Sequence, residues 1–216
     1  MKNIVVLISG RGSNLEALLR TADEEKWREE LDAAVVAVIS NRVDAAGLEV
    51  ARRAGIATTV VDHGKFETRE EFDRALSEQV DRHSPAVVVL AGFMRVLTPQ
   101  FVRRYAGRLV NIHPSLLPAF PGLRTHERAL AAGVRVHGAT VHFVSDEVDA
   151  GGIISQAVVP VVPGDDAAVL ADRVLEQEHH LLPRAVRLVL KQSVRWQDGR
   201  VLVSGTSTAD LAMLSP

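Results

Sequence analysis

Apolar runs alternate with amphipathic stretches along the first half of the chain. Each run consists largely of Val, Ile, Leu and Ala, which is typical of a parallel strand buried on both faces. The stretches between the runs repeat apolar residues every three to four positions, as on one face of a helix. We therefore expect strands at residues 3–9, 33–40, 57–61 and 85–91, and helices that begin near residue 15 and span residues 44–54 and 68–83.

This alternation predicts the fold class. Parallel neighbours in a sheet need long crossover connections, which are right-handed and usually helical. The expected architecture is α/β, with a Rossmann-like, doubly wound and mostly parallel sheet. Gly55 follows the second expected helix, at a position where glycine commonly ends helices.

The pattern of the second half predicts a mixed C-terminal part of the sheet. Two of its apolar runs are joined by a polar loop rather than a helix, so we expect their strands to be partly antiparallel. The longest helical stretch has Asp165 or Asp166 as a candidate N-cap, and Pro183 should kink or interrupt it. We expect strands at residues 109–112, 135–144 and 152–161, and helices at residues 124–132 and 165–190.

The last part of the chain is expected to form a hairpin and a tail. Residues 193–203 have Asp198-Gly199 at their centre, a dipeptide that favours tight hairpin turns. Residues 204–216 are small and polar and should form a loose C-terminal tail. No linker or repeat separates domains, so we expect one domain over residues 1–203, with halves at residues 1–108 and 109–203.

Composition excludes several classes of site and partner. The 216 residues include no cysteine, which excludes disulfides, thiolate metal sites and a cysteine nucleophile. The formal net charge of −2 gives no electrostatic footprint for nucleic acid. The N-terminus leads directly into a strand, and we find no signal peptide or membrane-spanning run, so we expect a soluble cytoplasmic protein.

A glycine-rich turn, Gly10-Arg11-Gly12-Ser13-Asn14, separates the first strand from the first helix. Backbone N–H groups at a helix N-terminus hold anions well, and Ser13 and Asn14 add side-chain donors. The spacing matches neither the Walker loop nor the full dinucleotide fingerprint, which favours a phosphate monoester over a dinucleotide. The alternative interpretation is a strand-to-helix turn that needs glycine only for its geometry.

Polar side chains follow the apolar start of the strand near residue 109, just before Pro114. Alternation along a strand places Asn111 and His113 on one face, at the carboxyl end where open parallel sheets bind ligands. Asp149, in a polar loop, is a candidate third member, because a carboxylate fixes the tautomer of a neighbouring histidine and favours its protonated form. An amide and an imidazolium could together stabilise the oxyanion that forms when an amine attacks an acyl carbon.

These candidates also have plainer interpretations. Asp149 could belong to a merely solvated loop, and a histidine is more often a surface or core residue than a catalyst. His126, His137 and His142 flank the expected site and stay ambiguous. A metal site built from His137 and His142 is disfavoured, because they lie along one strand without a carboxylate partner, and we expect no metal.

Five segments carry motifs of a known family: residues 6–15 (VLISGRGSNL), 90–95 (LAGFMR), 111–118 (NIHPSLLP), 137–142 (HGATVH) and 146–151 (DEVDAG). In order and spacing they closely resemble the phosphoribosylglycinamide formyltransferases, folate-dependent enzymes of purine synthesis. The resemblance covers about residues 3–190. The motif at residues 111–118 is shared by the wider formyltransferase superfamily, and the glycine-rich turn narrows the resemblance to this member.

The resemblance implies a formyltransferase fold and a reaction. The family transfers a formyl group from 10-formyltetrahydrofolate, its co-substrate, to the amino group of glycinamide ribonucleotide. The residues that match Asn111, His113 and Asp149 are its catalytic set. No nucleic acid or membrane partner is implied, and we expect a monomer or a homodimer.

The same resemblance implies the binding residues. Those that match Gly12, Ser13 and Asn14 hold the ribonucleotide phosphate, and the one that matches Glu178 contacts the ribose hydroxyls. Arg69 matches a position near the glutamate tail of the folate. The positions implied to contact the folate are Arg69, Met94, Arg95, Val96, Leu97, Val144 and Asp146.

Three positions depart from the family pattern. Arg11 occupies the variable place in the glycine-rich turn, and Arg124 stands where some relatives carry a histidine. Gly152 replaces a proline that commonly follows this aspartate loop, and so frees the backbone beside Asp149.

The sequence leaves other functions as alternatives. One is another transferase that uses 10-formyltetrahydrofolate, and one is a hydrolase with water as acceptor. A tRNA formyltransferase normally carries an additional C-terminal barrel and the hydrolase an additional N-terminal domain, and we expect neither in a chain of 216 residues. A nucleotide-binding regulator without catalysis is the third alternative, against which the intact triad argues.

Overall fold

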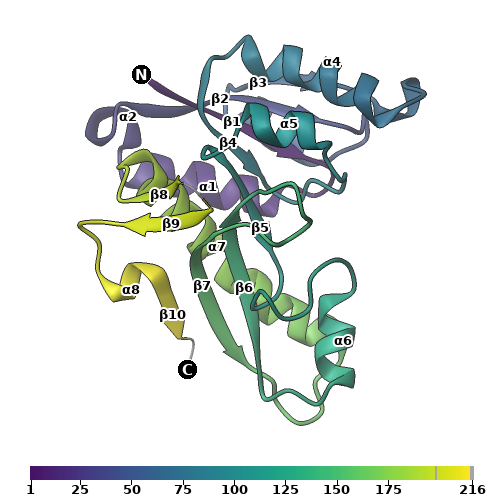
Figure 1. Cartoon of the computed structure of the whole chain (residues 1–216), viewed down its shortest axis with the longest axis vertical. Coiled ribbons are helices and arrows are strands. Elements are labelled where there is room, and N and C mark those ends of the chain that lie inside the picture. The colour runs from purple at the N-terminus through teal and green to yellow at the C-terminus, as the bar shows by residue number, and fades with distance from the viewer. Residues whose placement is uncertain (198, 215–216) are drawn as a thin grey trace. The chain divides into compact units, whose positions relative to one another are not determined.

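The computed structural model describes residues 1–197 and 199–214. The chain divides into two compact units, of which the first is Met1–Val110 and the second begins at Asn111. This division falls close to residue 108, where the boundary between the two halves is expected. Asp198, at the centre of the expected hairpin turn, lies outside the described residues. Figure 1 labels most of the helices and strands of both units.

The first unit is built on four parallel strands in the order β4-β1-β2-β3. Its expected strands and its three expected helices are confirmed, with small shifts at their ends. Three short helices were not predicted by the pattern: α2 (Trp27–Glu30), the 3₁₀ helix η1 (His63–Lys65) and α5 (Pro99–Arg104). The other elements are β1 (Lys2–Ile8), α1 (Ser13–Glu24), β2 (Ala33–Ser40), α3 (Gly47–Arg53), β3 (Ala57–Val60), α4 (Arg69–Asp81) and β4 (Pro85–Leu90).

Local chemistry explains where these elements begin and end. The helix α4 starts at a capping box, in which the Thr68 side chain accepts from a first-turn N–H group. Its buried face carries Phe72, Leu76 and Val80, the stripe that the periodicity predicts. Gly55 adopts a φ of +70° just after α3, as expected for a glycine that ends a helix.

The second unit combines parallel and antiparallel strands in the order β10-β7-β6-β5. The antiparallel pairing of β6 with β7 is confirmed, and α7 packs along both strands (Figure 1). The predicted α/β class, mostly parallel with a mixed C-terminal part, is therefore confirmed. The elements are β5 (Leu109–His113), α6 (Thr125–Ala131), β6 (Val136–Phe143), β7 (Ile153–Pro160), α7 (Ala167–Leu190), β8 (Val194–Gln197), β9 (Arg200–Val203), α8 (Thr208–Leu211) and β10 (Ala212–Leu214), with β8 and β9 forming the expected hairpin.

The expectation that Pro183 interrupts the long helix is wrong. The helix α7 begins after Asp166, whose side chain accepts a hydrogen bond from the Val169 N–H at 2.9 Å, and it continues through Pro183. Leu181 and Leu182, like Pro183 itself, are buried. Burying each leucine contributes about 1.5–3 kcal/mol, which together offsets the roughly 3 kcal/mol that an internal proline costs.

The expectation of a loose tail after residue 203 is also wrong for the described residues. They form α8 and β10, and β10 pairs in parallel with β7. Asp210 accepts hydrogen bonds from the Ser207 hydroxyl and backbone and forms an ion pair with Arg184 at 3.0 Å. A cap and an ion pair with a distant helix hold this segment, and neither is visible in hydrophobic periodicity.

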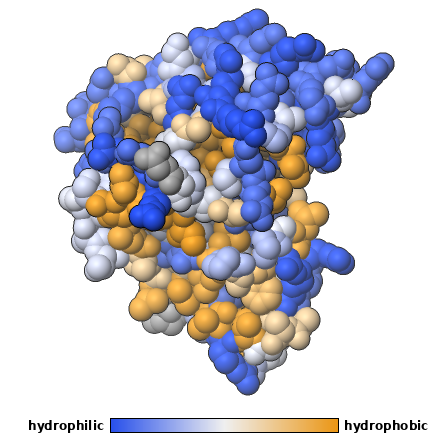
Figure 2. Space-filling model, viewed as in Figure 1, coloured by the Kyte–Doolittle hydropathy of each residue, from blue (hydrophilic) through white to orange (hydrophobic). Residues whose placement is uncertain are grey.

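On the face drawn in Figure 2, polar residues cover much of the surface and apolar residues gather over part of the second unit. Figure 2 shows hydrophobic residues over the C-terminal strands, where the exposed large apolar side chains are Leu202, Val203 and Leu214. Within residues 1–197 and 199–214, no helix combines the length and the apolar character needed to cross a membrane.

Candidate active site

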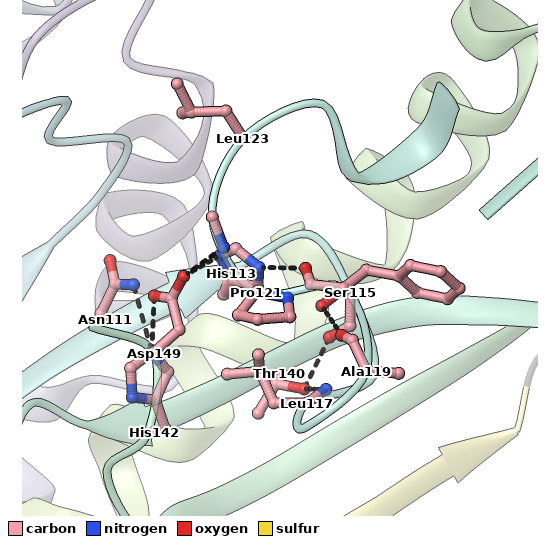
Figure 3. A network of polar contacts seen from close by, with 12 residues as sticks. Asn111, His113, Ser115, Leu117, Ala119, Pro121, Leu123, Thr140, His142 and Asp149 are labelled. Carbon is pink, nitrogen blue, oxygen red and sulfur yellow. Dashed lines mark hydrogen bonds and ion pairs between the residues drawn. The ribbon is translucent and has the colours of Figure 1, made fainter. Parts of the chain in front are cut away.

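Strand β5 brings Asn111 and His113 to the start of the candidate site in the second unit. Successive side chains of a strand point to opposite faces, so these two share a face and Ile112 lies on the other. His113 is 6% exposed, and Asn111 is partly buried. The strand ends at His113, which places both polar side chains at its carboxyl end (Figure 3).

Asp149 lies close to His113. Its carboxylate Oδ2 is 3.5 Å from Nδ1 of His113, and its side chain is only 10% exposed. The same oxygen accepts a hydrogen bond from the Gly122 N–H at 2.8 Å. Asp149 has a φ of +55°, a left-handed conformation that aspartate tolerates better than most residues. The predicted imidazole and carboxylate are thus brought together by the fold.

The hydrogen bond of His113 to Phe120 fixes which nitrogen is a donor. Nε2 of His113 lies 3.1 Å from the Phe120 carbonyl oxygen. A carbonyl only accepts, so Nε2 must carry a proton. The other nitrogen, Nδ1, is the one that faces Asp149 (Figure 3).

His142 joins Asn111 to this pair. Its Nδ1 donates to the Phe143 carbonyl at 2.9 Å, and Asn111 Nδ2 lies 3.2 Å from its Nε2. Burial lowers the pKa of His142, so the neutral ring offers Nε2 as an acceptor for the Asn111 amide. Asp149 Oδ1 is 3.8 Å from the same nitrogen. The sequence alone left the role of His142 ambiguous. The only signal for a role in this site was that His142 belongs to the segment 137–142, which resembles the family motif.

Gly152, the departure from the family pattern beside Asp149, is packed against the β8–β9 hairpin. A Cβ atom at this position would lie 1.9 Å from Cζ3 of Trp196 and 2.4 Å from a methyl group of Val201. The indole of Trp196 also packs on Phe143, with ring centroids 6.2 Å apart. The space that a side chain would need is therefore filled by the hairpin.

The glycine-rich turn forms the N-terminal end of α1 in the first unit. Gly12 is the N-cap residue with a φ of +84°, and Ser13 and Asn14 begin the helix. The first N–H groups of a helix have no intrahelical acceptor, which makes this end suited to a phosphate. Gly47, which sequence reasoning missed, approaches so closely that a Cβ on Gly12 would lie 2.5 Å from its Cα.

The segment implied to line the folate pocket is held at both ends within the first unit. The Met94 N–H donates to Ser9 Oγ at 2.7 Å, and the Thr98 N–H donates to Asp73 Oδ2 at 2.6 Å. Between these anchors Met94 and Val96 are exposed by 67% and 52%. Apolar side chains displayed on a tethered segment are suited to contact an apolar ligand. Arg95 and Leu97 are partly buried there, and Arg69 is exposed at the first residue of α4.

The remaining predicted binding residues lie in the second unit. Val144 and Asp146 belong to the loop between β6 and β7 that also carries Asp149. Glu178 is on α7 and is 7% exposed.

Comparison with known proteins places these features in a family. The model of the formyl transferase family matches residues 2–186. Phosphoribosylglycinamide formyltransferase of Escherichia coli (strain K12) is 49% identical over 214 residues, 96% of this chain and 99% of that protein. The human trifunctional purine biosynthetic protein adenosine-3 is 47% identical over 89% of this chain, which spans 19% of that protein.

Solved structures agree with the sequence comparison. The phosphoribosylglycinamide formyltransferase of Coxiella burnetii is 41% identical with a TM-score of 0.88, and the match covers 100% of this chain and 99% of that one. A formyltetrahydrofolate deformylase from Pseudomonas syringae is 32% identical with a TM-score of 0.84, over 94% of this chain and 66% of that one. With nearly the whole chain matched in sequence and in fold, it belongs to the formyl transferase family, among the phosphoribosylglycinamide formyltransferases.

Proposed function

We propose that Asn111, His113 and Asp149 catalyse the transfer of a formyl group from 10-formyltetrahydrofolate to the amino group of glycinamide ribonucleotide. Family membership gives the enzyme class, a formyltransferase of purine biosynthesis. The observation that supports the choice of residues is the approach of His113 Nδ1 to the Asp149 carboxylate at 3.5 Å, in a largely buried site that Asn111 joins through His142.

Two donors are suited to the oxyanion of the reaction. The neutral substrate amine attacks the formyl carbon, and the π electrons of the carbonyl group move to its oxygen. One hydrogen of Asn111 Nδ2 binds His142, and the second can bind this oxygen. When His113 is protonated, its Nδ1–H group is the other donor, because Nε2 is occupied by Phe120. One such donor is worth about 10²- to 10³-fold in rate.

Asp149 supports the proton transfer that completes the reaction. The proton lost by the attacking amine must reach the folate nitrogen before the bond between that nitrogen and the formyl carbon breaks. The Asp149 carboxylate lies 3.5 Å from Nδ1 of His113, and a water molecule beside it can relay the proton. The products are the formylated amine and tetrahydrofolate, and the proton gained by the folate nitrogen is the one that the amine lost.

The other predicted residues bind the substrates in this proposal. Gly12, Ser13 and Asn14 hold the ribonucleotide phosphate at the N-terminus of α1. Glu178 accepts hydrogen bonds from the ribose hydroxyls, since a carboxylate can accept from two neighbouring hydroxyls. The residues that contact the folate are Arg69, Met94, Arg95, Val96, Leu97, Val144 and Asp146.

Single substitutions test the catalytic set. The variants Asn111→Ala, His113→Ala and Asp149→Asn should each lower kcat by at least about 10²-fold, since each removes or misaligns an oxyanion donor or a proton relay. Binding of glycinamide ribonucleotide, measured by calorimetry, should change little. A His113→Ala enzyme with near-native turnover would rule the proposal out.

Hydrolysis of formyl-folate is a second candidate, because a deformylase shares the fold at 32% identity. It differs only in the acceptor, which would be water in place of the substrate amine. The two reactions are separated by incubating the enzyme with 10-formyltetrahydrofolate alone. We expect no release of formate until glycinamide ribonucleotide is added, and formate without the amine would favour hydrolysis.

A further inference from the structure

The loop between β5 and α6 holds both members of the histidine–carboxylate pair through its main chain. The Phe120 carbonyl accepts from His113 Nε2 at 3.1 Å, and the Gly122 N–H donates to Asp149 Oδ2 at 2.8 Å. The two contacts come from residues only two positions apart. The position of this short segment therefore sets both the orientation of the imidazole and the place of the carboxylate.

The backbone of this loop needs support from its surroundings. Phe120 and Arg124 have φ values of +55° and +54°, and Gly122 lies between them with a φ of +78°. A left-handed conformation is strained for a residue with a Cβ atom. Such a conformation persists where neighbouring contacts over-determine it.

Arg128, an exposed residue on α6, makes three contacts with the loop. Its Nη1 donates to the Pro121 carbonyl and lies 3.4 Å from the Leu123 carbonyl oxygen. Its guanidinium carbon lies 5.8 Å from the centroid of the Phe120 ring. The Phe120 ring also packs edge-on against the ring of His137, with the two ring centroids 5.9 Å apart. The guanidinium therefore contacts the carbonyl groups of the residues on either side of Gly122. It also contacts the side chain of Phe120, the residue whose carbonyl orients His113.

We propose that Arg128 is a positioning residue for formyl transfer. It holds residues 120–123 so that the Phe120 carbonyl fixes the donor nitrogen of His113 and the Gly122 amide fixes Asp149. This role rests on the proposed function of that pair. Arg128 acts through the loop and leaves substrate binding to other residues, so its loss should affect kcat far more than KM.

The test compares Arg128→Ala with Arg128→Lys and with Arg135→Ala, which removes an exposed arginine just beyond α6. Arg128→Ala should lower kcat by about ten- to a hundredfold, since a small misplacement of catalytic groups has effects of that size. KM for both substrates should stay within about threefold of the native values in this measurement. Arg128→Lys should fall between, because an ammonium group keeps the charge and loses the planar fork. Arg135→Ala should match the native enzyme.

A double-mutant cycle shows whether Arg128 works through His113. In a His113→Ala background, Arg128→Ala should cause little further loss, because the histidine that the loop orients is already gone. A loss as large as in the native background would overturn the proposal, as would native kcat in Arg128→Ala. A melting temperature of Arg128→Ala near that of Arg135→Ala excludes unfolding as the cause of a lower kcat. If the melting temperature of Arg128→Ala falls instead, Arg128→Lys is the deciding variant: a kcat between those of the native enzyme and Arg128→Ala supports the proposal, and a native kcat overturns it.

The two proposals fail in different ways. If His113→Ala keeps native turnover, the catalytic set is wrong and the cycle loses its meaning. If His113→Ala is inactive and Arg128→Ala is native, the catalytic set stands and only the positioning role is wrong.

Discussion

His137 shows how burial of a single residue makes stability depend on pH. It is 1% exposed on β6, and burial, together with the neighbouring His126, lowers its pKa to about 4 from the ordinary 6.5. Between these two values the unfolded chain binds a proton that the folded protein excludes. The stability that this residue contributes is therefore complete above pH 6.5 and is lost as the pH falls towards 4.

Replacing His137 should remove part of the acid sensitivity. Between about pH 7.5 and pH 5, the native protein should lose roughly 2 kcal/mol more unfolding free energy than His137→Gln. Urea denaturation of both proteins at the two pH values measures the difference. His180→Gln, which alters an exposed histidine of α7, should keep the native pH dependence. Equal losses in His137→Gln and the native protein would contradict the assigned pKa direction.

At the residue scale, the sequence predicts side chains better than main-chain contacts. Asn111 and His113 could be placed together because strand alternation is a local rule. Asp149 could be named as a candidate because its polar loop supplies a carboxylate of the kind that fixes the tautomer of a neighbouring histidine. The Phe120 carbonyl and the Gly122 amide could not be foreseen, since any residue has these groups. Their positions depend on left-handed backbone conformations that no composition reveals.

The turn before α1 depends on the close approach of two elements. Gly12 packs against Gly47 at the start of α3, and the Gly47 N–H donates to the Gly10 carbonyl at 3.0 Å. A side chain on Gly12 would collide with the backbone of α3, and its φ of +84° disfavours any residue with a Cβ atom. The shape of the glycine-rich turn is therefore fixed by a neighbouring helix as well as by its own glycines.

Substituting the two glycines of this turn should give different results. Gly12→Ala should lower the unfolding free energy by about 1–3 kcal/mol through backbone strain and overpacking, and should raise KM for glycinamide ribonucleotide. Gly10→Ala is the control for stability, because a Cβ there meets nothing within 4 Å. Thermal denaturation and initial-rate kinetics measure the two effects. Equal stability of the two variants would show that the Gly12–Gly47 contact is not tight.

At the element scale, the sequence predicts long periodic segments and misses short ones. The buried strands and α1, α3, α4 and α7 follow from hydrophobic pattern alone. The helices α2, α5 and α8 are too short for periodicity to register, and β10 exists only through its pairing with β7. The continuity of α7 through Pro183 is a tertiary effect, because burial of its apolar face outweighs a local preference.

Across the whole molecule, perturbed groups favour neutral over acidic conditions. Burial lowers the pKa of His126 and His142 as it does that of His137. Hydrogen bonds from Arg173 lower the pKa of Asp165 to about 2, and those led by Ser207 lower the pKa of Asp210. In every one of these cases the unfolded chain binds more protons than the folded protein, so stability rises with pH.

The protein should therefore lose stability in two stages as the pH falls. The contribution of His137 disappears between pH 6.5 and about 4, and those of His126 and His142 disappear below pH 6.5. The contributions of the aspartates disappear below the ordinary aspartate pKa of 3.8. The urea midpoint should decline steadily from neutral pH downwards. Asp73 opposes this trend, because burial raises its pKa, but it is one group among several. A midpoint that stays constant down to about pH 4.5 would contradict the prediction for the histidines.

The contact of Trp196 with Gly152 gives the protein an internal optical probe. The chain has two tryptophans, and the other, Trp27, lies in the first unit. A Trp27→Phe protein would leave a single indole, stacked beside the backbone that leads away from Asp149. Its emission would register movements of the loop between β6 and β7 without any added label, so ligand-induced changes at the carboxylate could be followed in real time.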